Sequence, residues 1–335
     1  MTDAEKVVGE AINAQSVDVL AVTKALVQIP DVGAKIREIQ FENLMEVDAN
    51  DDLLEELRDS IDPEIGSGIL EKANDEVAAR TGEERDWMLK IVLELWLFYA
   101  PNLEKLSITL DTCFDFQYFD GLRKKYKHLS FLSKLREIDA RHWDTEGGMD
   151  FSVITPLLTA APVHRVSVFS CTAFELDSDW TFPSVQQLVL DRAGLSLDDF
   201  NGMVKCFPKL EVLHYRLGDA CCLEGLGGDY ITAQKMSQSL IPLRDTLREL
   251  EIDQREHAET FGMELLEPIE TLKEMQKLEV LKIWKYDLMA DDDDEKPSAL
   301  LEKLPGSLKS ISIFGMEADE GLREALAAAD IEWMA

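Results

Sequence analysis

One short pattern of apolar residues returns along almost the whole chain and limits its fold more than any other feature. The pattern is apolar-x-x-apolar-x-apolar, and it occurs nine times. After a first gap of 67 residues, the starting positions lie 22 to 37 residues apart. The copies begin at Ile36, Leu103, Leu135, Val163, Val185, Leu210, Leu247, Leu278 and Leu308, and a weaker tenth copy begins at Ala328. Alternate apolar positions predict short strands, and the recurrence of the pattern along the chain predicts a repeat architecture.

Between the copies, apolar residues are spaced three or four positions apart, which predicts helices over 87–100, 117–133, 196–207, 258–276 and 318–329. Ser196 followed by Asp199 is typical of a capped helix start. A unit of one strand and one helix cannot bury its apolar faces alone, so it must stack on its neighbours. The sequence therefore predicts an α/β fold built from about nine to ten such units.

The stack is expected to be a curved solenoid, because strands pack about 4.8 Å apart whereas helices are about 10 Å across. A parallel sheet then lies on the concave side and the helices lie on the convex side. We expect residues 1–100 to form a helical N-terminal cap with an irregular first repeat. Residues 101–335 are expected to continue the same solenoid.

The repeated pattern resembles the leucine-rich repeat, over roughly residues 36–335. Phrases such as Ala100-Pro101-Asn102-Leu103-Glu104-Lys105-Leu106 and Phe207-Pro208-Lys209-Leu210-Glu211-Val212-Leu213 are similar to the divergent repeats of fungal F-box and leucine-rich repeat proteins. The family's Asn or Cys, three residues after the third apolar position, is matched only by Cys171. Residues 1–35 lack the Leu-Pro opening and the Trp-ended helix of an F-box. The resemblance implies a curved horseshoe and, as one alternative, a substrate-receptor subunit of a ubiquitin ligase; the missing F-box argues against adaptor binding.

Charge and cysteine content exclude several classes of protein. Lys and Arg number 34 and Asp and Glu number 66, a net charge of −32, which argues against nucleic-acid binding and against binding to an anionic membrane. Five cysteines at irregular spacings argue against a secreted disulfide scaffold. The most apolar stretch, 87–100, is shorter than the roughly 20 residues that a membrane helix needs. These features predict an intracellular protein, cytoplasmic or nuclear.

Alternate residues of each predicted strand point into the concave hollow. Net charge is −14 over residues 1–100, −3 over 101–217 and −15 over 218–335, so the middle is nearly neutral between acidic ends. Arginine and aromatic side chains supply much of the binding energy at protein interfaces. We therefore select four arginines, two aromatic residues and one histidine as partner-binding candidates: Arg141, Arg165, Phe169, Arg192, His214, Arg216 and Trp284.

The sequence favours a non-enzymatic scaffold that binds a protein or peptide on the concave face. HExxH, CxxC and GxSxG spacings do not occur, so no catalytic residue, metal or cofactor is predicted. One alternative is an enzyme or an anionic small-molecule binder that uses the concave arginines and histidine. Another is that the arginines pair with Asp139, Asp191 and Glu137 in a solvated ladder. A basic partner could also bind the acidic ends, which include the run Asp291–Glu295.

Overall fold

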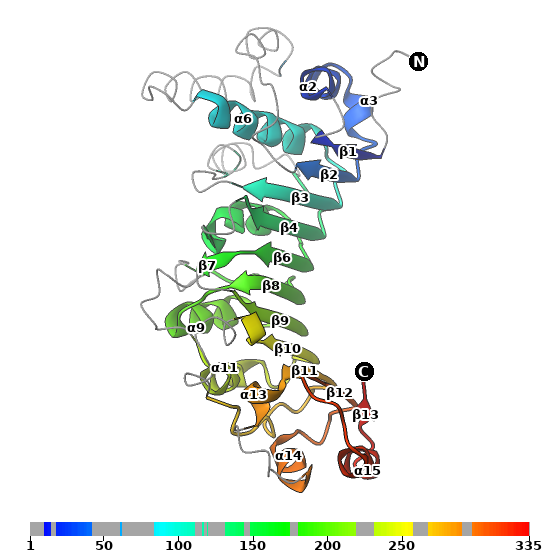
Figure 1. The fold of residues 1–335 in the computed structure, drawn as a ribbon. Coiled ribbons are helices and arrows are strands. Elements are labelled where there is room, and N and C mark those ends of the chain that lie inside the picture. The colour runs from blue at the N-terminus through cyan, green and yellow to red at the C-terminus, as the bar shows by residue number, and fades with distance from the viewer. Residues whose placement is uncertain are drawn as a thin grey trace. The chain divides into compact units, whose positions relative to one another are not determined.

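The fold is described from a computed structural model of the chain (Figure 1). It describes residues 10–14, 18–41, 61, 84–110, 116, 119, 131–143, 148–174, 180–218, 231–256, 267–289 and 297–334. Eleven strands form one sheet in the order β1-β2-β3-β4-β6-β8-β9-β10-β11-β12-β13. The chain divides into two compact units: Met1–Trp143 with Val153–Val163 is unit 1, and Asp144–Ser152 with His164–Ala335 is unit 2. The predicted boundary at residue 100 stays a prediction.

Unit 1 contains four strands of the sheet, which pair in parallel. They are β1 (Ala11–Asn13), β2 (Glu38–Phe41), β3 (Lys105–Leu110) and β4 (Glu137–His142). Its helices are α2 (Val19–Gln28), α3 (Pro30–Gly33), α6 (Glu84–Tyr99) and α8 (Thr155–Ala160). Trp96 of α6 packs edge-on against Phe41 of β2, with ring centroids 5.3 Å apart, and donates a hydrogen bond to Thr23 of α2. This contact joins the helical layer of the unit to its sheet.

Unit 2 contains seven strands of the sheet. They are β6 (Arg165–Phe169), β8 (Gln187–Ala193), β9 (Val212–Leu217), β10 (Glu249–Asp253), β11 (Val280–Trp284), β12 (Ser310–Phe314) and β13 (Glu332–Trp333), and each pairs in parallel with the next. A small second sheet joins β5 (Met149–Asp150) to β7 (Cys171–Ala173). Between strands lie α9 (Leu197–Cys206), α11 (Ala233–Ser239), η5 (Ile241–Leu243), α13 (Lys285–Leu288), α14 (Pro297–Lys303) and α15 (Glu320–Ala328); η3 (Phe151–Ile154) follows β5. In Figure 1, α9, α11 and α13 all lie on one side of the strands of this unit.

Every copy of the repeated pattern forms a strand, and its apolar positions face the core. All 27 apolar positions of the nine copies are at most 5% exposed. The middle positions stand in register: Ile39 pairs with Leu106 and Leu106 with Ile138 in unit 1. In unit 2 the same row runs through Val166, Leu188, Leu213, Leu250, Leu281 and Ile311. The predicted α/β class with a parallel sheet is therefore confirmed.

Strand β2 pairs directly with β3, so no strand from the long interval between the first two copies lies between them in the sheet. Strand β1 was not predicted. Its buried residues Ile12 and Ala14 follow the pattern, but Gly9 occupies the first position and hides the copy.

Three of the predicted helices are confirmed. Residues 87–100 fall on α6, 196–207 on α9 and 318–329 on α15. Ser196 caps α9 as expected, since its hydroxyl accepts a hydrogen bond from the Asp199 amide at 3.1 Å. Most of the helix predicted over 117–133 lies outside the described residues, as does the acidic run Asp291–Glu295.

The helix predicted over 258–276 is wrong for its described part, 267–276, which is extended with turns. Pro268 has no N–H to donate, and the next amides bond to other segments. Ile269 donates to the Asp287 carbonyl and Leu272 donates to the Lys303 carbonyl, both at 2.7 Å. The three-residue spacing of Ile269, Leu272 and Met275 suggested a helix, but here it places three buried side chains along an irregular segment.

Candidate functional site

The open face of the sheet in unit 2, opposite the helices, carries a hollow of about 740 Å³. Its lining comes from strands β6 to β12 and the residues that follow them. Two phenylalanines, four cations and four carboxylates line it: Phe169, Phe314, Arg192, Arg216, Arg255, Lys282, Asp191, Glu251, Asp253 and Glu256. The formal charges of these side chains cancel, on a chain whose net charge is −32.

A bulge in β8 sends two consecutive side chains to this hollow. The pairing of β8 with β9 shifts register between Leu190 and Ala193, and Arg192 has a positive φ of 52°. Leu190 and Ala193 are buried, whereas Asp191 and Arg192 are both partly exposed and line the hollow. A bulge re-aims a side chain that regular alternation would send to the other face. The bulge explains how Arg192 contributes to the same surface as Asp191.

Glu251 lies beneath the centre of the hollow and holds the cations around it. Its carboxylate accepts a hydrogen bond from Nε of Arg216 at 2.8 Å and lies 3.9 Å from Nζ of Lys282 and 3.7 Å from Nδ1 of His214. Lys282 and His214 also contact Glu249, at 2.6 and 2.9 Å. The side chain of Glu251 is only 5% exposed. A buried carboxylate with these partners fixes the positions of three basic side chains.

The pKa directions of this network agree with its geometry. Burial raises the pKa of Glu249, but the hydrogen bonds from Lys282 and His214 together with their charges outweigh it, so that the pKa is lowered overall. Burial lowers the pKa of Arg216, yet its bond to Glu251 and the charges of Asp191 and Asp253 raise it overall. Both groups therefore stay charged.

Each end of the hollow has an arginine placed over a phenylalanine ring. At one end the guanidinium of Arg192 lies 5.9 Å from the ring centre of Phe169 and bonds to Glu256 at 3.3 Å. At the other end Arg255 lies 4.7 Å from the ring centre of Phe314. Arg255 is fixed by Asp253 through Nε at 2.9 Å and Nη2 at 2.7 Å. Stacked, carboxylate-bound guanidinium groups lose little freedom when a ligand binds.

The structure brings together some of the predicted residues and leaves others apart. Phe169, Arg192 and Arg216 line the hollow, and His214 belongs to the network under it. Arg165 is exposed on β6 but does not line the hollow. Arg141 belongs to unit 1, where it pairs with Asp139 at 3.4 Å, so the ladder alternative describes this arginine.

The expectation that Trp284 faces open solvent is wrong. Its side chain is 7% exposed, and its ring lies 4.9 Å from that of Tyr286 in an edge-on contact. Gly315 lies beside the indole: a Cβ at that position would come 3.5 Å from Nε1. The tryptophan therefore supports the open face from within.

The sequence analysis did not select Glu251, Asp253, Lys282 and Phe314, which line the same hollow as Arg216, and it missed the roles of Arg255 and Glu256. One signal was available. Asp191, Arg216 and Asp253 occupy the same row on neighbouring strands and alternate in sign, and Arg216 pairs with Asp253 in the register of β9 with β10. Alternation of this kind predicts cross-strand ion pairs.

A buried acid lies behind the hollow. Asp287 of α13 is fully buried, and neither carboxylate oxygen has a hydrogen-bond partner at good geometry in the described part of the chain. Burial and the charge of Asp253 raise the pKa of Asp287 well above its usual range, although the Gln254 amide partly offsets them.

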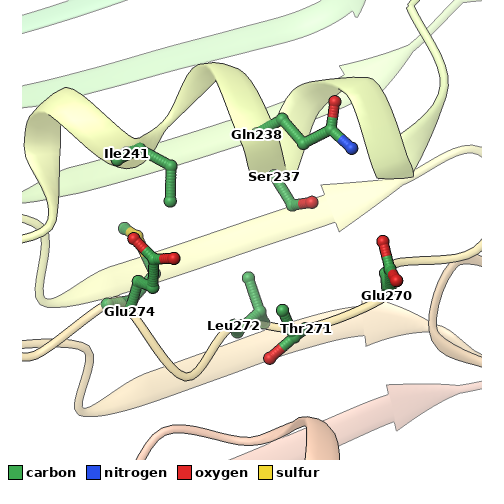
Figure 2. A pocket seen from close by; sticks show the side chains of 8 residues that line it. Ser237, Gln238, Ile241, Glu270, Thr271, Leu272 and Glu274 are labelled. Carbon is green, nitrogen blue, oxygen red and sulfur yellow. The ribbon is translucent and has the colours of Figure 1, made fainter.

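A second, much smaller hollow of about 150 Å³ lies on the helical side, between α11 with η5 and the segment 270–275 (Figure 2). Ile241, Leu272 and Met275 give it apolar walls, and Glu270 and Glu274 lie at its edges. It has room for about one side chain. The larger hollow on the open face is therefore the candidate site.

The residues that the structure describes lack two features. No helix among them is long and apolar enough to cross a membrane. They also contain no group of three or more His, Cys, Asp or Glu side chains placed to hold a metal ion.

Comparison with known proteins gives no family for this chain. No protein-family model matches it, and no curated protein matches it. A crystal structure of a Bacteroides fragilis protein, determined as a structural-genomics target, is 15% identical with a TM-score of 0.42. That match covers 70% of this chain and 65% of the other, so the chain spans less than two thirds of that protein's length. A likeness this distant says nothing about function.

Proposed function

We propose that this chain is a non-enzymatic binding protein of the leucine-rich-repeat type, whose open sheet face in unit 2 binds an extended segment of a partner protein. The observation that carries the proposal is the hollow itself. It joins fixed arginines and two phenylalanine rings on a face that the helices of the unit leave uncovered. Arginine and aromatic side chains held in place are the groups that dominate interface energies.

The repeat geometry supports this proposal. Parallel strands with all 27 apolar positions buried leave the alternate side chains on the opposite face. In a solenoid of stacked strand–helix units, such side chains form an extended binding surface.

The chemistry of the hollow supports binding over catalysis. Its carboxylates are occupied by arginine and lysine, and the lowered pKa of Glu249 makes that neighbouring group a weak proton acceptor. These ion pairs position side chains for a ligand and do not leave a carboxylate poised to remove a proton.

The test is quantitative affinity capture from cell lysate with three forms of the chain. The site variant carries Arg192→Ala, Arg216→Ala and Arg255→Ala. The matched control carries Arg37→Ala, Arg136→Ala and Arg248→Ala, which removes the same charge from arginines outside the hollow. We expect the control to retain the partners of the wild-type chain and the site variant to lose them.

Equal capture by the site variant and the wild-type chain would refute the site, and circular dichroism at the capture temperature establishes that all three forms are folded. The same experiment tests the substrate-receptor alternative, which requires a ubiquitin-ligase adaptor among the captured proteins.

A further inference from the structure

The charges of the hollow are arranged in layers. Two of its carboxylates lie underneath: the side chains of Glu251 and Asp253 are 5% and 11% exposed. The arginines that they hold lie on top, since the side chains of Arg216 and Arg255 are 45% and 48% exposed. The other two carboxylates, Asp191 and Glu256, are 38% and 56% exposed, so a ligand meets guanidinium groups at the centre of the hollow and carboxylates beside them.

Arg216 offers the clearest contact for an anion. Within the described residues its guanidinium donates one hydrogen bond, from Nε to Glu251. Its Nη1 lies 3.9 Å from Asp191, beyond hydrogen-bond distance. The outer edge of the guanidinium therefore has donors for an incoming carboxylate, which arginine binds through two parallel bonds.

The two ends of the hollow suit flat apolar side chains. Phe169 with Arg192 and Phe314 with Arg255 each place a guanidinium group near a phenylalanine ring, 5.9 and 4.7 Å from the ring centre. In strand order β6-β8-β9-β10-β11-β12, Arg216 stands two strands from Phe169 and three from Phe314. At about 4.8 Å per strand these intervals are about 10 and 14 Å. An extended peptide that crosses the strands covers them with about three and four residues, at roughly 3.3 Å each.

Charge further limits the kinds of ligand that can bind the hollow. The lining has no net charge and the chain carries −32, so a polyanion would be repelled overall. A doubly charged phosphate at Arg216 would also lie close to Asp191 and Glu251. A single carboxylate matches the one outer edge of Arg216.

Resting on the proposed function, we infer that the partner segment is extended and about eight residues long. It carries an internal Asp or Glu whose carboxylate binds Arg216. An aromatic or large apolar residue lies about three positions to one side of this acid and about four positions to the other. The arginines of the two end walls contact those flanking side chains.

The test is a selection of random twelve-residue peptides, displayed on phage, against the purified full-length chain. Bound peptides are eluted, sequenced and retested on the variants Arg216→Gln, Arg216→Lys, Arg192→Gln and Arg255→Gln, with Arg248→Gln as the matched control. Thermal melts establish that each variant is folded. A bidentate carboxylate contact predicts that Arg216→Gln weakens the selected peptides roughly 10- to 100-fold and that Lys restores only part of this.

The outcomes separate the two proposals. Peptides with the acid and the two flanking apolar positions, lost in Arg216→Gln and kept in Arg248→Gln, support the inference. Peptides that depend on Arg192, Arg216 or Arg255 but lack the acid, or contain a basic residue in its place, overturn the inference and leave the proposed function standing. If no selected peptide depends on Arg216, Arg192 or Arg255, both are overturned.

Discussion

Replacing Asp287 by Asn should make unit 2 more stable at neutral pH and change how its stability depends on pH. Asp287 is fully buried, its oxygens lack hydrogen-bond partners at good geometry in the described residues, and its pKa is raised. In the folded chain this carboxyl therefore keeps its proton at pH values where the unfolded chain has lost it. The stability that it contributes is complete below about pH 3.8 and is lost as the pH rises toward the raised pKa.

The magnitude follows from linkage. Over that interval, one extra bound proton in the folded state lowers the free energy of unfolding by about 1.4 kcal/mol per pH unit. Asn has the same shape and no titratable proton, so Asp287→Asn removes this slope. The difference in unfolding free energy between variant and wild type should thus grow in favour of the variant by about 1.4 kcal/mol per unit, until the pH reaches the raised pKa.

The assay is urea unfolding followed by tryptophan fluorescence at half-unit steps from pH 4.5 to 7.5. Asp330→Asn is the control, because it makes the same substitution on an exposed residue whose φ of 60° also suits Asn. Parallel pH profiles for wild type and Asp287→Asn would refute the reasoning. They would mean that Asp287 is ionised and paired in the folded chain.

Three further substitutions test the fold and the network. Leu213 is fully buried in the apolar row of β9, so Leu213→Ala should lower the free energy of unfolding in urea by about 3–5 kcal/mol. The neighbouring Val212 is partly exposed, so Val212→Ala should lower it by under about 1 kcal/mol, and equal losses would contradict the assigned faces. Glu251→Gln should lower the free energy of unfolding by about 1–3 kcal/mol. The loss is smaller than for breaking a fully buried ion pair, because Arg216 is partly exposed. An unchanged melting temperature would show that Glu251 does not anchor the network. Ser196→Ala removes the cap of α9 and should cost about 0.5–2 kcal/mol, while Ser196→Asp should retain most of the stability; a neutral Ala variant would count against the cap.

The strands could be predicted from the sequence because their signal is local. Each strand needs three apolar residues at fixed offsets, and the parallel register then follows from stacking identical units. The helical layer was harder to predict. The segment 267–276 has apolar residues at helical spacing, yet Pro268 and the carbonyls of Asp287 and Lys303 draw its backbone into an extended path. Those acceptors come from later in the chain, and no local pattern reveals them.

The candidate site could be predicted only in part, for similar reasons. Alternation placed Phe169 and Arg216 on the correct face. The inclusion of Arg192 in the hollow depends on a β-bulge, and the burial of Trp284 depends on Tyr286 and Gly315 in neighbouring segments. Arg255 enters the site because Asp253, two residues earlier, turns it over Phe314. Such choices depend on side chains from several repeats at once.

The central claim is that a partner lies on the open face of unit 2. Site-specific photocrosslinking tests it most directly, with benzoylphenylalanine placed at Phe169 or Phe314 and, on the helical side, at Lys235 of α11. After irradiation in lysate, adducts are identified by mass spectrometry. We expect positions 169 and 314 to label the same partner, on one short stretch of its chain, and position 235 to leave it unlabelled. Adducts formed at position 235 but absent at 169 and 314 would contradict the account.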